Sequence, residues 1–376
     1  MDREAVAREP VVRDPSAREL EIDGRLINDA GDCYVIAEIG HNHQGNLEQC
    51  MKLFTLAKMC GADAVKLQKR DNRALFTREM YDSPYHSENA FGATYGAHRE
   101  FLEFGRDDYI QLKLHAREIG ITFFSTAFDL KSADFLADIG MPAYKIASGD
   151  ITNTPLLRHV ARIGRPIIMS TGGADMDDVR RAYDTVMEIN PKLAILQCTS
   201  GYPPAFEEMN LRVIETFREA FPTTVVGLSS HDSGIAMALA GYMLGARIVE
   251  KHFTLNRAMK GTDHAFSLEH SGLEKMVRDL KRARIALGDG VKRRYPSEEK
   301  PLYKMAKKIV AARDLPAGHV LAQEDLAFKA PNDGLPPYHA DHLVGMRLTR
   351  PLAEDEAIGY ADLTSEDAPA SPAVVP

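Results

Sequence analysis

The sequence predicts an α/β protein in which a closed (β/α)8 barrel, the TIM-barrel fold, is followed by a small β-rich domain. Eight short apolar segments alternate with segments that have the apolar spacing of helices, which favours a parallel sheet. Together the eight units occupy roughly 250 residues, the usual size of this barrel. An open, doubly wound sheet is the structural alternative, but no predicted strand is followed by a G-x-G-x-x-G motif and the eighth unit would be surplus.

The first β-α-β unit sets the pattern for the barrel. Its strand is followed by Asn46, which can cap a helix over residues 47–60, and Gly61 can end that helix in a left-handed conformation. Each later strand likewise follows a Gly or Pro that stops the preceding helix. The eight predicted strands are Val35 to Ile39, Ala64 to Gln68, Thr122 to Thr126, Ala143 to Ala147, Pro166 to Ser170, Leu193 to Cys198, Val225 to Ser229 and Ile248 to His252.

The rest of the chain divides at changes in composition. Residues 1–18 are predicted to be a disordered arm, and residues 19–292 form the barrel domain, with an N-terminal hairpin that turns at Asp23-Gly24. Residues 293–301 are a linker, residues 302–363 a small domain of short alternating runs, and residues 364–376 a disordered Ala/Pro/Ser tail. The long connection from Arg70 to Arg106 is expected to be a substrate lid.

Composition narrows the class of protein. The chain of 376 residues is 44% hydrophobic and 27% charged, as is typical of a soluble globular enzyme. The N-terminal residues have no signal-peptide pattern and no segment is apolar for long enough to span a bilayer, so we expect a cytoplasmic protein. The net charge of -8 argues against nucleic-acid binding. The four cysteines occur singly and are interpreted as free core thiols.

Polar residues stand at the carboxyl ends of the predicted strands, where TIM barrels place their active sites. Two lysines, several serines and a Ser-Thr-Gly-Gly turn combine cations, hydroxyls and backbone amides, which suits a phosphate or carboxylate group. An anionic small substrate is therefore predicted. The alternative is that Lys66 and Lys145 form structural ion pairs with Glu38 and Asp150.

Two histidines at neighbouring strand ends, His231 and His252, can face one point and hold a divalent metal with exchangeable positions. His41 and His43 are a rival pair, and a single histidine is more often a hydrogen-bonded core or rim residue. Glu250 could orient His252 from the same strand face. The carboxylates of Glu38, Asp150 and Asp263 are candidates for proton transfer or for binding sugar hydroxyls.

With these residues in place, the chain from about Tyr34 to Asp362 resembles the sialic acid synthase family, the N-acylneuraminate synthases. Several motifs match in the same order, which makes the resemblance specific. The C-terminal domain resembles the antifreeze-like (SAF) domain of that family. The motifs are IAEIGHNHQG, GADAVKLQK, TYGAHREFLEF, PAYKIASGD, MSTGG, LQCTSGYP, GLSSH, VEKHFT and KGTDHAFSLE.

The resemblance implies condensation of phosphoenolpyruvate with an N-acyl-mannosamine or its 6-phosphate. It implies that His231 and His252 bind Mn2+ or another divalent cation such as Mg2+ or Co2+, with Glu38 and Asp150 as the acid/base pair. It also implies a domain-swapped homodimer, in which the SAF domain closes over the partner's active site. The residues assigned to phosphoenolpyruvate are Lys66, Lys145, Ser148, Ser170, Ser200 and Ser229, and those assigned to the sugar are Gln68, Asn89, Tyr202 and Asp263.

Three departures from the pattern of the bacterial enzymes leave the identity of the sugar substrate open. Asp150 stands where the bacterial free-sugar enzymes have Glu, Ser200 stands where they have Asn, and the segment 329–332 lacks their Arg. All three resemble the animal-type synthases, which use the 6-phosphorylated sugar. The alternatives are a synthase for legionaminate, pseudaminate or deaminated sialic acid, or a non-catalytic sugar- or ice-binding protein built on the C-terminal domain.

Overall fold

The computed structural model describes residues 18–364. The predicted disordered arm and tail therefore lie outside the described residues, except at their inner ends. Arg18 donates a hydrogen bond to the carbonyl oxygen of Arg218 at 2.7 Å, and Thr364 belongs to strand β14 (Leu363–Thr364). Both residues thus belong to the folded part of the chain.

Eight parallel strands close into a barrel, which confirms the predicted fold. Each strand pairs with the next along the chain, and β10 pairs with β3 to close the ring. The observed strands agree with the eight predicted segments to within a few residues at each end. They are β3 (Tyr34–Gly40), β4 (Ala64–Lys69), β5 (Thr122–Ala127), β6 (Tyr144–Ile146), β7 (Ile167–Ser170), β8 (Leu193–Cys198), β9 (Val225–Ser230) and β10 (Ile248–His252).

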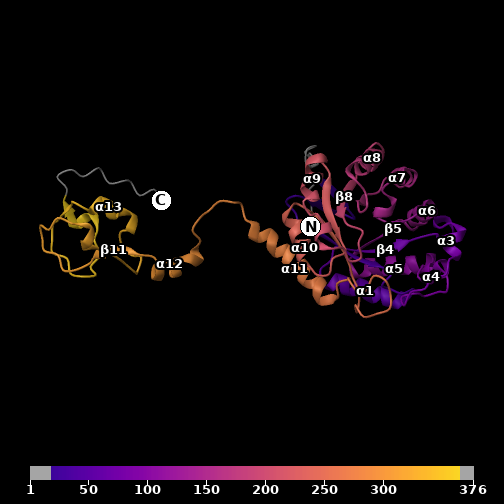
Figure 1. Ribbon diagram of the computed structural model, residues 1–376, viewed down its shortest axis with the longest axis horizontal. Helices are drawn as coiled ribbons and strands as arrows, with labels where there is room; N and C mark the ends of the chain where they lie inside the picture. The colour runs from indigo at the N-terminus through magenta and orange to yellow at the C-terminus, as the bar shows by residue number, and fades with distance from the viewer. Residues whose placement is uncertain (1–17, 365–376) are drawn as a thin grey trace, which may run out of the picture. The chain divides into compact units, whose positions relative to one another are not determined.

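Helices lie around these strands and bury their apolar faces against them (Figure 1). Asn46 caps α1 as predicted, since its side chain accepts from the backbone N–H of Gln49 at 2.9 Å. The barrel helices are α1 (Leu47–Met59), α5 (Arg106–Ile119), α6 (Leu130–Ile139), α7 (Thr154–Arg162), α8 (Met176–Met187), α9 (Val213–Ala220), α10 (Ala236–Met243) and α11 (His270–Leu287).

The predicted N-terminal hairpin is present as β1 (Glu19–Ile22) and β2 (Arg25–Asn28). Its buried side chains, Leu20, Ile22 and Ile27, share one apolar cluster with the inward-facing residues at the amino ends of the barrel strands. The hairpin therefore fills one end of the barrel interior and leaves the other end for polar groups.

Strand alternation positions those polar groups. Inward-facing side chains recur every second residue, so an apolar residue near the start of a strand is followed by a polar one closer to its carboxyl end. Ile36 thus precedes Glu38, and Ala64 precedes Lys66. The same step runs from Ala143, just before β6, to Lys145, from Ile168 to Ser170 on β7, and from Ile248 to Glu250 on β10.

The long connection predicted as a lid is folded into three short helices, α2 (Asn72–Leu75), α3 (Arg78–Asp82) and α4 (Tyr95–Phe101). Each begins at a side-chain cap, provided by Asp71, Thr77 and Thr94. The segment is tied to the loop after β10, because Asn89 Oδ1 accepts from the backbone N–H of Gly261 at 2.9 Å. It is an ordered wall beside the barrel mouth.

The chain divides into two units, residues 1–288 and 289–376. In the second, β11 (Lys308–Ala311) pairs with β12 (Leu326–Lys329), and β13 (Arg347–Leu348) pairs with β14, around a small core of leucine and isoleucine side chains. A short helix, α13 (Ala340–Leu343), completes it. Part of the predicted linker is helical, because α12 spans Glu299–Met305.

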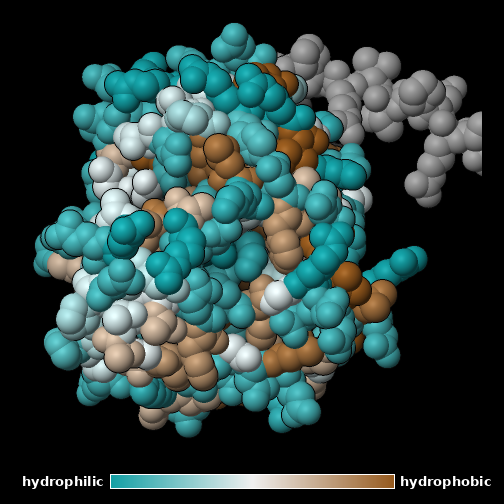
Figure 2. All heavy atoms as spheres, turned by 90° about the vertical axis from the view of Figure 1, so that its right-hand side faces the viewer, coloured by the Kyte–Doolittle hydropathy of each residue, from teal (hydrophilic) through white to brown (hydrophobic). Residues whose placement is uncertain are grey.

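The face of the molecule in Figure 2 is mainly hydrophilic, and its apolar side chains form small, separate groups. Within residues 18–364, no helix combines the length and the apolar character that crossing a membrane requires.

Candidate active site

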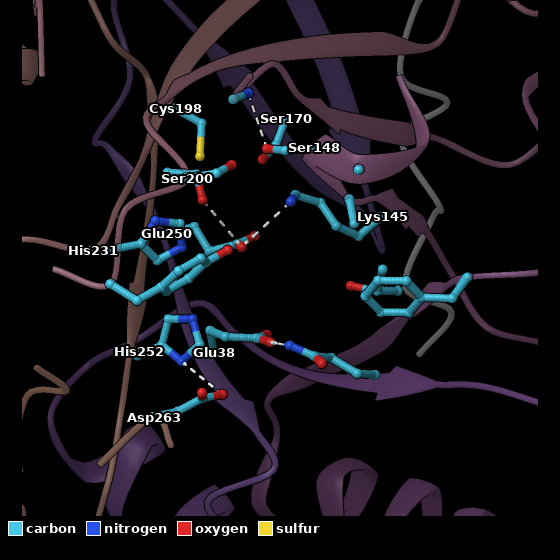
Figure 3. Close-up of a pocket in the computed structure, with 18 of the residues that line it drawn as sticks. Glu38, Lys145, Ser148, Ser170, Cys198, Ser200, His231, Glu250, His252 and Asp263 are labelled. Atoms are coloured by element: carbon cyan, nitrogen blue, oxygen red, sulfur yellow. Dashed lines mark hydrogen bonds and ion pairs between the residues drawn. The ribbon is translucent and has the colours of Figure 1, made fainter. Parts of the chain in front are cut away.

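A cavity of about 680 Å³ opens at the carboxyl ends of the barrel strands. All eight strands contribute to its lining, as expected for a TIM barrel. Figure 3 shows the side chains converging from around the ring. The strand residues that line it are Glu38, Lys66, Gln68, Thr126, Lys145, Ser170, Cys198, Ser229, Glu250 and His252.

Four alternating charges are buried in the cavity wall. Lys66 Nζ lies 2.6 Å from Glu38 Oε2 and 3.6 Å from Glu250 Oε1. Lys145 Nζ lies 3.4 Å from the same Glu250 oxygen. The structural ion pairs considered as the alternative are thus half right. Lys66 does pair with Glu38, but Lys145 pairs with Glu250 from the opposite side of the barrel and not with Asp150.

Burial and these charges set the protonation of the group. Burial raises the pKa of Glu38 to about 7, although Lys66 opposes the shift. Burial would also raise the pKa of Glu250, but Lys145 and Lys66 outweigh it and lower the value to about 2. Glu250 is thus the permanent counter-ion of the two lysines, while Glu38 can gain or lose a proton near neutral pH.

Hydroxyl groups and a backbone amide surround the lysines. Ser148, Ser170, Ser200 and Ser229 all line the cavity, and the Ser170 hydroxyl is buried without a hydrogen-bond partner. The N–H of Gly172 donates to Ser148 Oγ at 2.9 Å. A Cβ at position 172 would lie 2.2 Å from Ser200 Oγ, so only glycine permits this close approach.

His231 and His252 lie side by side, with their ring centroids 5.4 Å apart (Figure 3). The Nδ1 of His231 is 3.0 Å from the carbonyl oxygen of Thr199, and a proton donated there leaves Nε2 free to bind a metal. The Nδ1 of His252 is buried without a hydrogen-bond partner, 3.7 Å from Asp263 Oδ2, and burial lowers the pKa of this histidine to about 4.

These two imidazoles fit a divalent cation whose remaining positions are filled by water or substrate. Among residues 18–364, no group of three or more His, Cys, Asp or Glu side chains is placed to hold a metal. The rival pair is engaged elsewhere. His41 lies between two arginines, and His43 Nδ1 accepts from the N–H of Gly45 while its ring stacks on Phe104.

The residues assigned to the sugar fall into two groups. Gln68, Tyr202 and Asp263 line the cavity. The side chains of Gln68 and Asp263 both approach Gly40, since a Cβ at position 40 would lie 3.2 Å from Asp263 Oδ2 and 3.4 Å from Gln68 Nε2. Asn89 does not line the cavity and is hydrogen-bonded to Gly261.

Asp150, assigned as half of the acid/base pair, does not line the cavity either. Its Oδ1 accepts from the side chain of Asn153 at 3.1 Å, and burial raises its pKa. The structure places Glu38 in the lining of the cavity, and the catalytic roles of Glu38 and Asp150 stay predictions from the resemblance.

Several lining residues received no individual role from the sequence, among them Thr126, Cys198, Arg70 and Arg99. Thr126 accepts from Lys66 Nζ at 2.8 Å, and Cys198, interpreted as a core thiol, lies at the cavity wall. Thr126 and Cys198 are each the last residue of a predicted strand and face the barrel interior, and this position could have identified them from the sequence. Arg70 and Arg99 lie outside the predicted strands, and only the fold of the connection brings them to the cavity.

Comparison with known proteins finds matches for both parts of the chain. Residues 53–292 match the NeuB family and residues 308–364 match the SAF domain. The chain is 39% identical over 342 residues to N-acetylneuraminate-9-phosphate synthase of Homo sapiens, covering 90% of this chain and 95% of that protein. It is 34% identical to N,N'-diacetyllegionaminic acid synthase of Campylobacter jejuni, covering 86% of this chain and 98% of that protein.

A solved structure shares the architecture. N-acetylneuraminic acid synthetase from Leptospira borgpetersenii, crystallised with citrate, superposes with a TM-score of 0.66 at 30% identity, covering 76% of this chain and 95% of that one. The family match covers more than half of the chain, and the curated relatives align along nearly their whole lengths. The chain therefore belongs to the NeuB family of sialic acid synthases and carries a C-terminal SAF domain.

Proposed function

We propose that the protein condenses phosphoenolpyruvate with N-acetylmannosamine or its 6-phosphate, forming N-acetylneuraminate or N-acetylneuraminate 9-phosphate and releasing phosphate. The observation that carries this proposal is a single cavity holding two buried lysines, a ring of hydroxyls and two adjacent imidazoles. Relatives that share 34–39% identity are named as synthases of N-acetylneuraminate 9-phosphate and of diacetyllegionaminic acid.

The lysine end of the cavity suits phosphoenolpyruvate, which carries a phosphate and a carboxylate. Lys66 and Lys145 supply the positive charge, and Ser148, Ser170 and the Gly172 turn supply hydrogen-bond donors. When Glu38 takes up a proton, it loses its negative charge and attracts Lys66 less strongly, so the ammonium group of Lys66 is available to the anion. Uptake of a proton near neutral pH therefore favours binding at this end.

Glu38 is the acid/base group that the geometry supports. It lies 2.6 Å from Lys66 Nζ and accepts from Gln68 Nε2 at 2.7 Å, so it stands between the anion end and the sugar end. A pKa of about 7 suits proton transfer at physiological pH. Asp150 is retained as its proposed partner on the strength of the resemblance.

A divalent ion such as Mn2+, held by His231 and His252, would polarise the open-chain aldehyde of the sugar. The protein orients both rings in advance. The carbonyl of Thr199 holds His231, and the ring of Tyr202 lies 4.3 Å from it, centroid to centroid. Asp263 lies beside His252, where it can also bind a sugar hydroxyl.

A synthase acting on the precursor of legionaminate, pseudaminate or a deaminated sialic acid is the second candidate. The 34% identity to a diacetyllegionaminic acid synthase favours it specifically. Such enzymes would share the lysine and histidine end of the cavity and differ around Gln68, Tyr202 and Asp263.

We further propose that the protein works in the cytoplasm as a domain-swapped homodimer.

The first prediction tests the reaction itself. The purified protein with Mn2+ and phosphoenolpyruvate is expected to release inorganic phosphate when N-acetylmannosamine or its 6-phosphate is added, and mass spectrometry should detect the matching nonulosonate. Mannose 6-phosphate and a legionaminate precursor test the second candidate. If none of these sugars elicits phosphate release, the proposed function is wrong.

The second prediction concerns the anion end. Lys66→Met should raise the phosphoenolpyruvate KM on the order of 100-fold, because loss of one partner of a bound, buried anion costs a few kcal/mol. The sugar KM should change far less. Lys131→Met is the control, since Lys131 is exposed and pairs with Asp71 outside the cavity. Equal effects of Lys66→Met on both KM values would contradict the assignment.

The third prediction concerns the metal. His231→Ala and His252→Ala, singly or together, should abolish Mn2+-dependent turnover and Mn2+ binding measured by calorimetry, while the thermal unfolding transition remains cooperative. His115→Ala is the control, because His115 contacts Thr55 between two outer helices. Retention of normal metal-dependent activity in the double variant would place the ion elsewhere, with His41 and His43 tested next.

The fourth prediction concerns the SAF domain, whose loop 329–334 we propose to cover the partner subunit's sugar site and exclude water. Lys145→Met removes the barrel site, whereas Lys329→Ala with Asn332→Ala alters only the loop. Mixing the two inactive variants should restore part of the activity, since some mixed dimers then contain one complete site. Failure to recover activity after confirmed subunit exchange would contradict action across subunits.

A further inference from the structure

Two arginines flank one buried histidine at the edge of the cavity. Arg70 Nη1 lies 2.9 Å from His41 Nε2, and Arg99 Nη1 lies 3.2 Å from His41 Nδ1. All three residues line the cavity. Arg70 follows strand β4, whereas Arg99 comes from helix α4 in the connection between β4 and α5.

This arrangement lacks a hydrogen-bond acceptor. A neutral imidazole has one accepting nitrogen and one N–H, and guanidinium groups only donate. One of the two arginines must therefore point an N–H group at another donor. Burial, together with the charges of Arg70 and Arg99, lowers the pKa of His41 well below its usual value, so the ring stays neutral and keeps a single accepting nitrogen.

The two positive charges are also incompletely balanced. The one ion pair of the Arg70 guanidinium within the described residues is a long one, 4.0 Å from Nη1 to Glu103 Oε1, and Lys69 Nζ lies closer to that carboxylate, at 2.9 Å from Oε2. Arg99 has no ion-pair partner in the described part of the chain, and its other contacts are to the Tyr95 hydroxyl. Asp263 faces the same space and has its pKa lowered by His252 and more weakly by both arginines, against the effect of burial.

Both side chains are held in place before any ligand arrives. Arg70 is 8% exposed, stacks on the Phe128 ring at 3.8 Å, and donates to Gln68 Oε1 at 2.6 Å. The Arg99 guanidinium lies 5.0 Å from the Tyr95 ring centroid. Fixed guanidinium groups bind phosphate well, because little side-chain entropy is lost and two parallel N–H groups match two phosphate oxygens.

The arginines are separate from the lysine end. A chain of contacts runs from Arg70 to Gln68, from Gln68 to Glu38, and from Glu38 to Lys66, at 2.6, 2.7 and 2.6 Å. Gln68, a residue assigned to the sugar, therefore stands between the two cationic groups. A substrate lying along Gln68 would have one end near Glu38 and the other near Arg70.

We propose that Arg70 and Arg99 form a second anion-binding site, which takes the phosphate of a 6-phosphorylated sugar. The inference rests on the proposed function and decides between its two substrates in favour of the phosphorylated one. The sugar aldehyde lies toward Glu38 and the histidines. The phosphate monoester at the other end of the sugar carries a charge of about -1.5 to -2 at pH 7, and its oxygens supply the hydrogen-bond acceptors that the two arginines lack. Recognition of the phosphate is thereby separated from recognition of phosphoenolpyruvate.

The test compares two sugars in one variant. For Arg99→Gln, we expect the ratio of kcat/KM for N-acetylmannosamine 6-phosphate to kcat/KM for N-acetylmannosamine to fall on the order of 100-fold. Arg99→Lys should recover part of the ratio, because it keeps the charge but not the fork of donors. Calorimetry with mannose 6-phosphate in the absence of phosphoenolpyruvate should show the same loss of binding.

Arg73→Gln is the matched control. Arg73 comes from the same connection and also lies over a tyrosine ring, Tyr81 at 3.4 Å, but it does not line the cavity. This variant should keep both the activity and the ratio of the wild-type protein. Thermal unfolding of each variant distinguishes loss of a ligand contact from loss of the wall that holds Arg99.

Other outcomes would overturn the inference while sparing the proposed function. These are a wild-type protein that prefers the unphosphorylated sugar, an equal loss of activity toward both sugars in Arg99→Gln, or a rise confined to the phosphoenolpyruvate KM. Absence of phosphate release with every sugar would instead refute the proposed function.

Discussion

The buried charges of Glu38, Lys66, Lys145 and Glu250 are the constraint on which the rest of the site depends. A single ion moved from water into a protein interior costs several kcal/mol, so none of the four is tolerable without its neighbours. The group is balanced only when all four meet at one level inside the barrel. Strand alternation achieves this, because each of these side chains comes two residues after an apolar residue that faces the end of the barrel filled by the hairpin.

The cavity combines a rigid end with an adaptable one. Its lysines, histidines and Glu250 stand on barrel strands, whose mutual register fixes their separations, as chemistry at a reacting carbon demands. The opposite end is built from the connection 70–106 and the loop around Asp263, and such segments change readily without disturbing the barrel. Enzymes of one family can therefore keep the phosphoenolpyruvate chemistry and alter the sugar.

The arginine pair illustrates how a loop can add a function to a conserved type of scaffold. Arg70 extends a barrel strand, and Arg99 reaches it only because α4 folds back over the mouth. The imidazole of His41 separates the two guanidinium groups and cannot satisfy both. Polar groups that are held together and remain short of a partner are what ligand recognition requires, since the ligand then supplies the missing acceptor.

The sequence by itself determined the barrel, because periodicity of apolar residues and Gly or Pro stops are local properties of the chain. It also indicated Lys66, His231 and His252, since the carboxyl end of a predicted strand can be located in the sequence. The partner of Lys145 could not be found this way. β6 and β10 lie on opposite sides of the closed ring, so the contact of Lys145 with Glu250 crosses the interior, and no sequence spacing reports it.

Only the tertiary structure decided which polar residues reach the cavity. Asp150 and Asn89 are both assigned to the site by the family resemblance, yet their side chains bond to Asn153 and Gly261 outside the lining. Arg99 lies within the motif TYGAHREFLEF but at no predicted strand end, and it reaches the cavity only through the fold of the connection. The physical reason is that a strand fixes side-chain direction by its two-residue period, whereas the direction of a loop residue depends on packing against distant parts of the chain.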